Sequence, residues 1–238
     1  PGPDMRIDQV GIPDAMARDL FGPRVARSVG PAALDEAMTG NWVVVNRAPT
    51  LAPTAMLAFR PVRVAGPAIR IHPLACALMN ADFDGDQVAV VLPITEAGQG
   101  DARERLSIAG HLRRDPSVVR WLCVAHEMVW GLAELSRRPG GLAEIAELAG
   151  IDVQAPDGII TRETLQDAMA RRLARDGVDA ALDAIQRLLH RGFDVAKGSG
   201  ASICPFPGEG FDRPVEPDTD EPAAWSAYGD AIVDAVTA

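Results

Sequence analysis

The segment Asn80-Ala81-Asp82-Phe83-Asp84-Gly85-Asp86 places three carboxylates at alternate positions with a single glycine among them. In a regular strand, this alternation would put all three side chains on one face, within reach of one ion. Gly85 allows the backbone to bend out of the strand so that the carboxylates converge. Because Mg²⁺ prefers oxygen ligands and keeps open positions for phosphates, the segment predicts a catalytic metal loop at Asp82, Asp84 and Asp86.

Other acidic loops fit this segment less well. An EF-hand requires Gly at loop position 6 and Glu at position 12, where this chain has Gln87 and Pro93. Sugar-phosphate mutases carry a similar Asp-x-Asp-Gly-Asp loop, but they pair it with a phosphorylatable serine in a Ser-His-Asn type segment, which is absent here. A solvated acidic turn is the simplest alternative.

The heptapeptide resembles the catalytic loop of the largest, β′-type subunit of bacterial RNA polymerases. Further segments resemble β′ sequence in the same order, most densely over residues 41–95. They are Arg6-Ile7-Asp8-Gln9-Val10-Gly11-Ile12-Pro13, Asn46-Arg47-Ala48-Pro49-Thr50-Leu51, Ala58-Phe59-Arg60-Pro61-Val62, Ile71-His72-Pro73-Leu74, Glu127-Met128-Val129-Trp130-Gly131-Leu132 and Gly192-Phe193 through Ser199-Gly200-Ala201-Ser202. The chain is therefore similar to a fragment or a reduced paralogue of that subunit.

The resemblance implies a role for each residue of the motif. Asp82, Asp84 and Asp86 would bind Mg²⁺ for nucleotidyl transfer from an NTP to an RNA 3′ end. Arg47 and Asn80 match positions that contact the sugar of the incoming nucleotide, and their side chains suit hydrogen bonds to ribose hydroxyls. The alternative is a catalytically silent β′-like paralogue that acts as a regulatory or interaction module.

A polymerase of this kind needs a β-like subunit whose lysines face the aspartates, so the implied partners are that subunit, other polymerase subunits, the DNA template and the RNA product. This sequence also departs from the family. Ala52-Pro53 stands where a His-Arg pair is usual, the cysteine-rich zinc elements are absent, and the predicted barrel is one strand short. We expect a partner chain at its open edge.

The bulk composition indicates a globular chain. It has 238 residues, 47% of them hydrophobic, and a mean hydropathy near zero. The net charge of −10 is the wrong sign for gripping nucleic acid through phosphate neutralisation alone. Three widely spaced cysteines encode neither a disulfide framework nor a zinc knuckle, and no apolar run predicts a membrane span or a leader. These features predict a cytoplasmic protein.

Residues 1–95 predict an α+β region that the resemblance identifies as a partial double-psi β-barrel bearing the metal loop. Short apolar runs predict strands over residues 42–45, 56–64, 68–71 and 87–92. Helices are expected over residues 12–21, 31–38 and 74–79, the second ending before Gly40. His72 precedes Pro73 near a core strand, and we interpret it as a packing residue.

Residues 96–203 predict a mostly helical region. Apolar spacing favours helices over 96–112, 117–135 and 142–148, and then a helical hairpin over 161–175 and 179–190 with Gly177 and Gly192 as stops. His111, His126 and His190 have no metal-ligand spacing. Residues 204–222 are rich in proline and glycine and predict a linker, followed by a terminal helix over 223–238.

Overall fold

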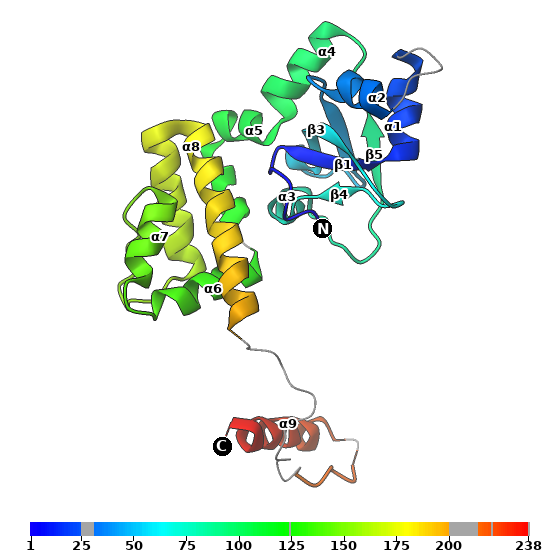
Figure 1. Ribbon diagram of the computed structural model, residues 1–238. Coiled ribbons are helices and arrows are strands. Elements are labelled where there is room, and N and C mark those ends of the chain that lie inside the picture. The colour runs from blue at the N-terminus through cyan, green and yellow to red at the C-terminus, as the bar shows by residue number, and fades with distance from the viewer. Residues whose placement is uncertain (25–30, 124, 200–213, 220, 238) are drawn as a thin grey trace. The chain divides into compact units, whose positions relative to one another are not determined.

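The computed structural model describes residues 1–24, 31–123, 125–199, 214–219 and 221–237 (Figure 1). The chain divides into a larger unit, Pro1–Ser199, and a smaller unit, Gly200–Ala238. The smaller unit contains helix α9 (Pro222–Thr237), where the sequence predicts the last helix. Residues 204–213 and 220 of the expected linker lie outside the described residues.

The larger unit has an α+β fold in which a curled, five-stranded half-barrel precedes a long helical region (Figure 1). Its strands lie in the order β4-β1-β3-β2-β5. They are β1 (Gln9–Pro13), β2 (Val43–Arg47), β3 (Met56–Val64), β4 (Arg70–Ile71) and β5 (Val88–Val91). The four strands expected from the sequence are confirmed, although β4 is shorter than predicted.

Strand β3 curls the sheet because it changes partner along its length. Its first half pairs antiparallel with β2, with Val43 opposite Phe59, and its second half pairs parallel with β1, from Arg60 to Val64. Pro61 lies just past the point at which β3 changes its partner from β2 to β1. A proline, which has no N–H group to donate, interrupts the hydrogen bonding of the sheet least at such a point. Strand β1 was not predicted, because the five-residue run that forms it contains glycine and proline and acquires its partners only in the folded chain.

Short helices cover the half-barrel. They are α1 (Asp14–Phe21), α2 (Pro31–Met38) and α3 (Pro73–Met79), with 3-10 turns η1 (Gly22–Arg24) and η2 (Pro53–Ala55). These positions confirm the three predicted helices. Arg63 on β3 ties α1 to α2, since its guanidinium lies 2.8 Å from the carboxylates of both Asp14 and Asp35.

The helical region is more broken than its apolar spacing predicts. It contains α4 (Glu96–Asp101), the π-turn η3 (Ala102–Leu106), α5 (Ile108–Arg114), the 3-10 segment η4 (Pro116–Cys123), α6 (His126–Ser136), α7 (Gly141–Ala149) and α8 (Arg162–Gly198). The predicted continuous helix over 96–112 is wrong because Ser107 leaves the helical conformation and its hydroxyl accepts from the Gly110 N–H, at 2.9 Å. The predicted helix over 117–135 is likewise split into η4 and α6.

Helix α8 breaks at Gly177, where φ is +84°, as the sequence predicts. The second predicted stop is wrong, since the helix continues through Gly192 to Gly198. Gly192 instead allows close packing against α6: a Cβ atom built on Gly131 would lie 1.9 Å from the Gly192 carbonyl oxygen. The two glycines mark a helix crossing at which the backbones meet.

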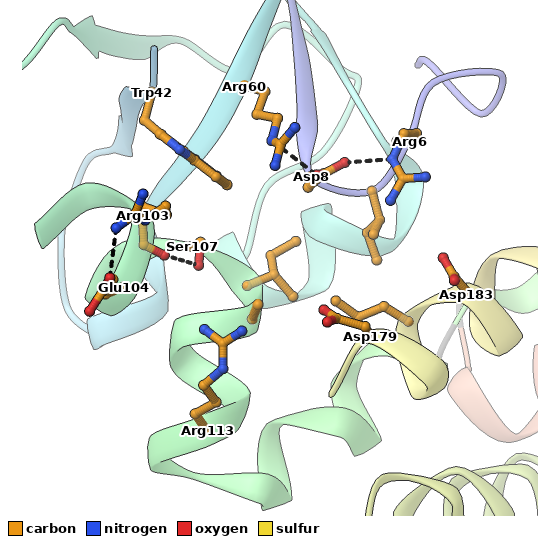
Figure 2. A pocket seen from close by; sticks show the side chains of 14 residues that line it. Arg6, Asp8, Trp42, Arg60, Arg103, Glu104, Ser107, Arg113, Asp179 and Asp183 are labelled. Carbon is orange, nitrogen blue, oxygen red and sulfur yellow. Dashed lines mark hydrogen bonds and ion pairs between the residues drawn. The ribbon is translucent and has the colours of Figure 1, made fainter. Parts of the chain in front are cut away.

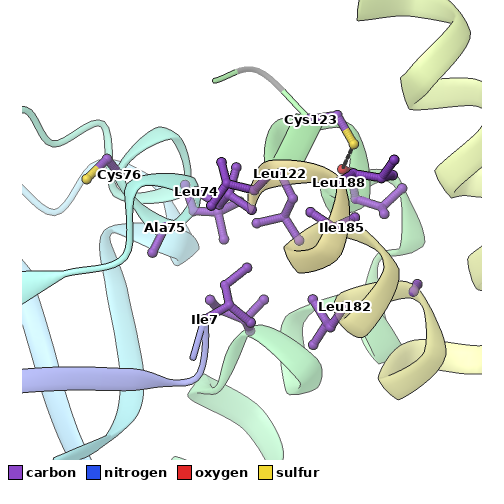
Figure 3. Close-up of a cluster of buried hydrophobic side chains, with 14 of the residues drawn as sticks. Ile7, Leu74, Ala75, Cys76, Leu122, Cys123, Leu182, Ile185 and Leu188 are labelled. Atoms are coloured by element: carbon purple, nitrogen blue, oxygen red, sulfur yellow. Dashed lines mark hydrogen bonds between the residues drawn. The ribbon is translucent and has the colours of Figure 1, made fainter. Parts of the chain in front are cut away.

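Among the described residues, the larger of two hydrophobic clusters joins the half-barrel to the helices (Figure 3). Ile7 and Leu74 from the barrel side meet Leu122 on η4 and Ile185 on α8, and each of these side chains is at least 98% buried. Residues 1–199 therefore form one compact unit, and the expected boundary at residue 95 stays a prediction. None of the helices in the described part of the chain has the length and apolar character needed to cross a bilayer.

Candidate functional site

The acidic loop begins at the end of α3. His72 caps the helix start, because its Nδ1 accepts from the Leu74 N–H at 3.3 Å, and Pro73 occupies the first turn. The helix ends at Asn80, which adopts a left-handed conformation with φ of 49° and donates its N–H to the Cys76 carbonyl. The chain then turns through residues 81–87, with Gly85 at φ of +120°, before β5 begins. The backbone bend expected at Gly85 is therefore present.

Arg47 and Asp86 form the central contact of the loop. The Arg47 Nε lies 3.0 Å from Asp86 Oδ2, and the same oxygen accepts from the Asp82 N–H at 3.0 Å. The Arg47 guanidinium, together with this N–H, holds the pKa of the Asp86 carboxyl below its ordinary value. Arg47 closes β2 and Asp86 precedes β5, its antiparallel neighbour, so the sheet brings together two residues that are far apart in sequence.

The donor chemistry of the loop fits Mg²⁺, because Asp82, Asp84 and Asp86 supply hard carboxylate oxygens in a solvent-accessible loop. The arrangement is not a formed metal site. Asp82 Oδ1 accepts from the Phe83 N–H at 2.7 Å, and Asp86 is held by Arg47. Within the described ranges, no three His, Cys, Asp or Glu side chains are grouped closely enough to hold a metal ion.

Two cavities flank the loop and separate the predicted residues. Asp82 and Asp86 line one of ≈510 Å³ together with Phe83, which is 48% exposed. Asn80 lines another of ≈590 Å³, whose walls come from η2, α3, α5 and η4. The structure thus brings Arg47 and Asp86 together but places Asn80 at a different cavity from Asp82 and Asp86.

The histidines hold structural positions. His72 is fully buried, its Nε2 has no partner among the described residues, and burial lowers its pKa to about 4. His190 contacts the Pro3 carbonyl, with Nε2 at 2.8 Å, and His126 lies beside Arg162. His111 is buried on α5, where burial and Arg114 lower its pKa. The interpretation of His72 as a packing residue is consistent with this geometry.

A third cavity, of ≈580 Å³, contains residues that sequence reasoning missed (Figure 2). Trp42 lies at its edge with the Arg60 guanidinium 5.4 Å from the ring centre. Asp8 accepts from Arg6 at 3.1 Å and lies 3.5 Å from Arg60. Arg6 and Asp8 come from the segment before β1, Trp42 immediately precedes β2, and Arg60 lies on β3. No local spacing in the sequence therefore marks this cavity. None of the predicted site residues lines it.

Comparison with known proteins shows that the half-barrel and the acidic loop are similar to part of the largest subunit of RNA polymerase. Residues 28–108 match the family model described as RNA polymerase Rpb1, domain 2, and these residues include β2, β3, α3 and the acidic loop. The chain is 39% identical over 153 residues to DNA-directed RNA polymerase subunit beta' of Clostridium botulinum (strain Eklund 17B / Type B), an alignment that covers 55% of this chain and 13% of the relative.

Two further relatives give longer alignments of slightly lower identity. The beta' subunits of Micrococcus luteus and Chlorobium luteolum are each 36% identical over 183 residues, covering 66% and 67% of this chain. The chain spans about an eighth of the length of these curated relatives, since the alignments cover 12 to 14% of them. It is thus homologous to RNA polymerase beta'/Rpb1 domain 2 over 55 to 67% of its length.

Proposed function

We propose that this chain is the metal-bearing half of a DNA-directed RNA polymerase active site, of the β′ type. The observation that carries the proposal is the homology over residues 28–108, which includes an intact run of Asp82, Asp84 and Asp86 at the edge of a curled half-barrel. We interpret this half-barrel as a partial double-psi β-barrel. A β-like subunit, other polymerase subunits, the DNA template and the RNA product are the proposed partners, and the proposed place of action is the cytoplasm.

The three aspartates would hold Mg²⁺, which when bound supplies charge stabilisation at the reacting phosphate of an NTP. For Asp86 to join that set, its carboxylate must exchange Arg47 for the ion. The exchange would leave the Arg47 guanidinium without its carboxylate partner and available to ribose hydroxyls. Arg47 and the metal would therefore compete for Asp86 before nucleotide arrives. Asn80 would contact the sugar from the end of α3.

The alternative function is a catalytically silent β′-like module that binds polymerase subunits as a regulator. The closed Arg47–Asp86 ion pair favours it, because this pair occupies one of the three carboxylates. Ala52-Pro53 favours it as well, since a basic pair is usual at that place in the family. The enzyme hypothesis is favoured by the five polar residues Arg47, Asn80, Asp82, Asp84 and Asp86, which a silent module does not require.

The decisive experiment purifies the chain from its native cells with its bound subunits and measures Mg²⁺-dependent nucleotide incorporation by the complex. We expect incorporation to be lost with Asp84→Asn and retained with Asp157→Asn, which makes the same charge change at an exposed position outside the loop. A β-like partner together with this result supports the polymerase. A chain without partners, or an assembled complex that never incorporates nucleotide, favours the silent module.

A further inference from the structure

The cavity beside Asn80 has the character of a ligand site. Six of the residues that line it are Pro53, Leu78, Asn80, Arg114, Val118 and Trp121, and its volume is ≈590 Å³. We propose that this cavity, named here the Trp121 cavity, binds one nucleotide unit with its base stacked on the Trp121 ring and its phosphate near Arg114. The inference rests on the proposed function and adds a binding residue that the sequence resemblance does not supply.

Trp121 is placed as an aromatic platform. It lies on η4, a segment whose other apolar side chains are buried: Val119 and Leu122 are 0% exposed. The Trp121 side chain is instead 59% exposed and turned away from that core. Beside it, Leu78 and Val118 provide apolar walls that are each less than 10% exposed. A flat aromatic face next to a buried apolar wall suits a nucleobase, because every base can stack on such a face whatever its identity.

Arg114 supplies a held positive charge. Its Nη2 donates to the Arg105 carbonyl at 2.6 Å and lies 3.2 Å from His111 Nδ1, so the guanidinium is fixed by neutral groups. Within the described ranges it has no carboxylate partner at ion-pair distance, and its Nε and Nη1 groups remain to donate to a phosphate. Asp115 also lines the cavity, but its carboxylate accepts from both the backbone N–H and the hydroxyl of Ser117.

Asn80 supplies the polar group at the loop side. Its backbone is set by the left-handed end of α3, and its side-chain amide makes no hydrogen bond to another described residue. An amide can both donate to and accept from a base edge or a sugar hydroxyl. Asn80 is two residues from Asp82, so a nucleotide unit in the Trp121 cavity would lie beside the proposed metal loop. The cavity volume lies within the range of small-ligand sites.

The test measures binding of fluorescein-labelled hexauridylate to the purified chain by anisotropy, with UTP as a competitor and a chelator in place of Mg²⁺. We expect Trp121→Ala to raise the Kd roughly 5- to 150-fold, the range given by loss of one stacked base. Trp121→Tyr should restore most of the affinity, because a phenol ring still stacks. Trp130→Ala removes another partly exposed tryptophan, on α6, and should leave the Kd unchanged. Arg114→Gln should reduce the slope of log Kd against log salt by about 0.7.

Competition by UTP would identify a free nucleotide as the ligand, and binding of the oligonucleotide without such competition would identify a strand; either supports the site. Equal Kd values for Trp121→Ala and Trp130→Ala, with matching urea transitions to show that both are folded, would overturn it. So would the absence of saturable binding of either probe up to about 1 mM. Because metal is chelated throughout, failure of the metal loop leaves this result unaffected.

Discussion

The crossing of α6 and α8 makes Gly131→Ala a sharp test of the helical region. The new Cβ would lie 1.9 Å from the Gly192 carbonyl oxygen, whereas ordinary contact begins at 3.4 Å, so the backbones must separate by about 1.5 Å (3.4 − 1.9). The obstacle is backbone and cannot rotate aside. Overpacking of this kind costs about 1–3 kcal/mol, which exceeds the gain of up to about 1 kcal/mol from replacing a helical glycine by alanine.

The measurement is equilibrium urea unfolding followed by circular dichroism, with Gly100→Ala as the matched control. Gly100 lies on α4, and a Cβ built there meets no atom within 4 Å. We expect Gly131→Ala to lower the free energy of unfolding by about 1–3 kcal/mol and Gly100→Ala to raise it slightly. If the two variants had the same midpoint and slope, the close crossing of α6 and α8 would be refuted.

Two further predictions concern the loop and the buried histidine. Arg47→Met removes the competitor for Asp86 and should tighten Mg²⁺ binding, measured by calorimetry, roughly two- to fivefold. Arg113→Met makes the same charge change on α5 and should leave Mg²⁺ binding unchanged. Weaker Mg²⁺ binding by Arg47→Met would contradict the exchange of Arg47 for the ion. In the folded chain the pKa of His72 is about 4, below the ordinary value of 6.5 that holds when the chain is unfolded. The unfolded chain therefore binds the extra proton, and the stability of the fold falls by about 2 kcal/mol as pH drops from about 7 to about 5. His72→Asn should remove this part of the pH dependence of urea unfolding, and an unchanged dependence would assign it to other groups.

Much of the barrel region could be predicted from local sequence. The β-branched run before Asn46 and the long apolar run ending at Val64 form strands, because such side chains favour a pleated, half-buried surface. Gly177 interrupts a helix as expected, since its positive φ suits glycine. The continuous helices predicted from apolar spacing over 96–112 and 117–135 were wrong, because that spacing indicates which side chains face the core and not whether the backbone stays α-helical between them.

In the candidate site too, some features could be predicted from local sequence and others could not. The local sequence was enough to predict the acidic loop, because Asp82, Asp84 and Asp86 and the bend at Gly85 all lie within five consecutive residues. No spacing pairs Arg47 with Asp86, which lie 39 residues apart and meet because β2 and β5 are neighbours. Nor does any motif mark the cavity of Trp121, whose walls converge from four separate elements.

The sequence by itself therefore determined the acidic loop, the apolar runs that form β2, β3 and β5, and the break at Gly177, because each depends on propensity or backbone freedom within a few residues. Tertiary structure alone decided the parallel pairing of β1 with β3, the partner of Asp86, and the separation of Asn80 from the other loop residues. These depend on register and packing between distant segments, which are chosen by the burial of one shared core and leave no periodic trace in the sequence.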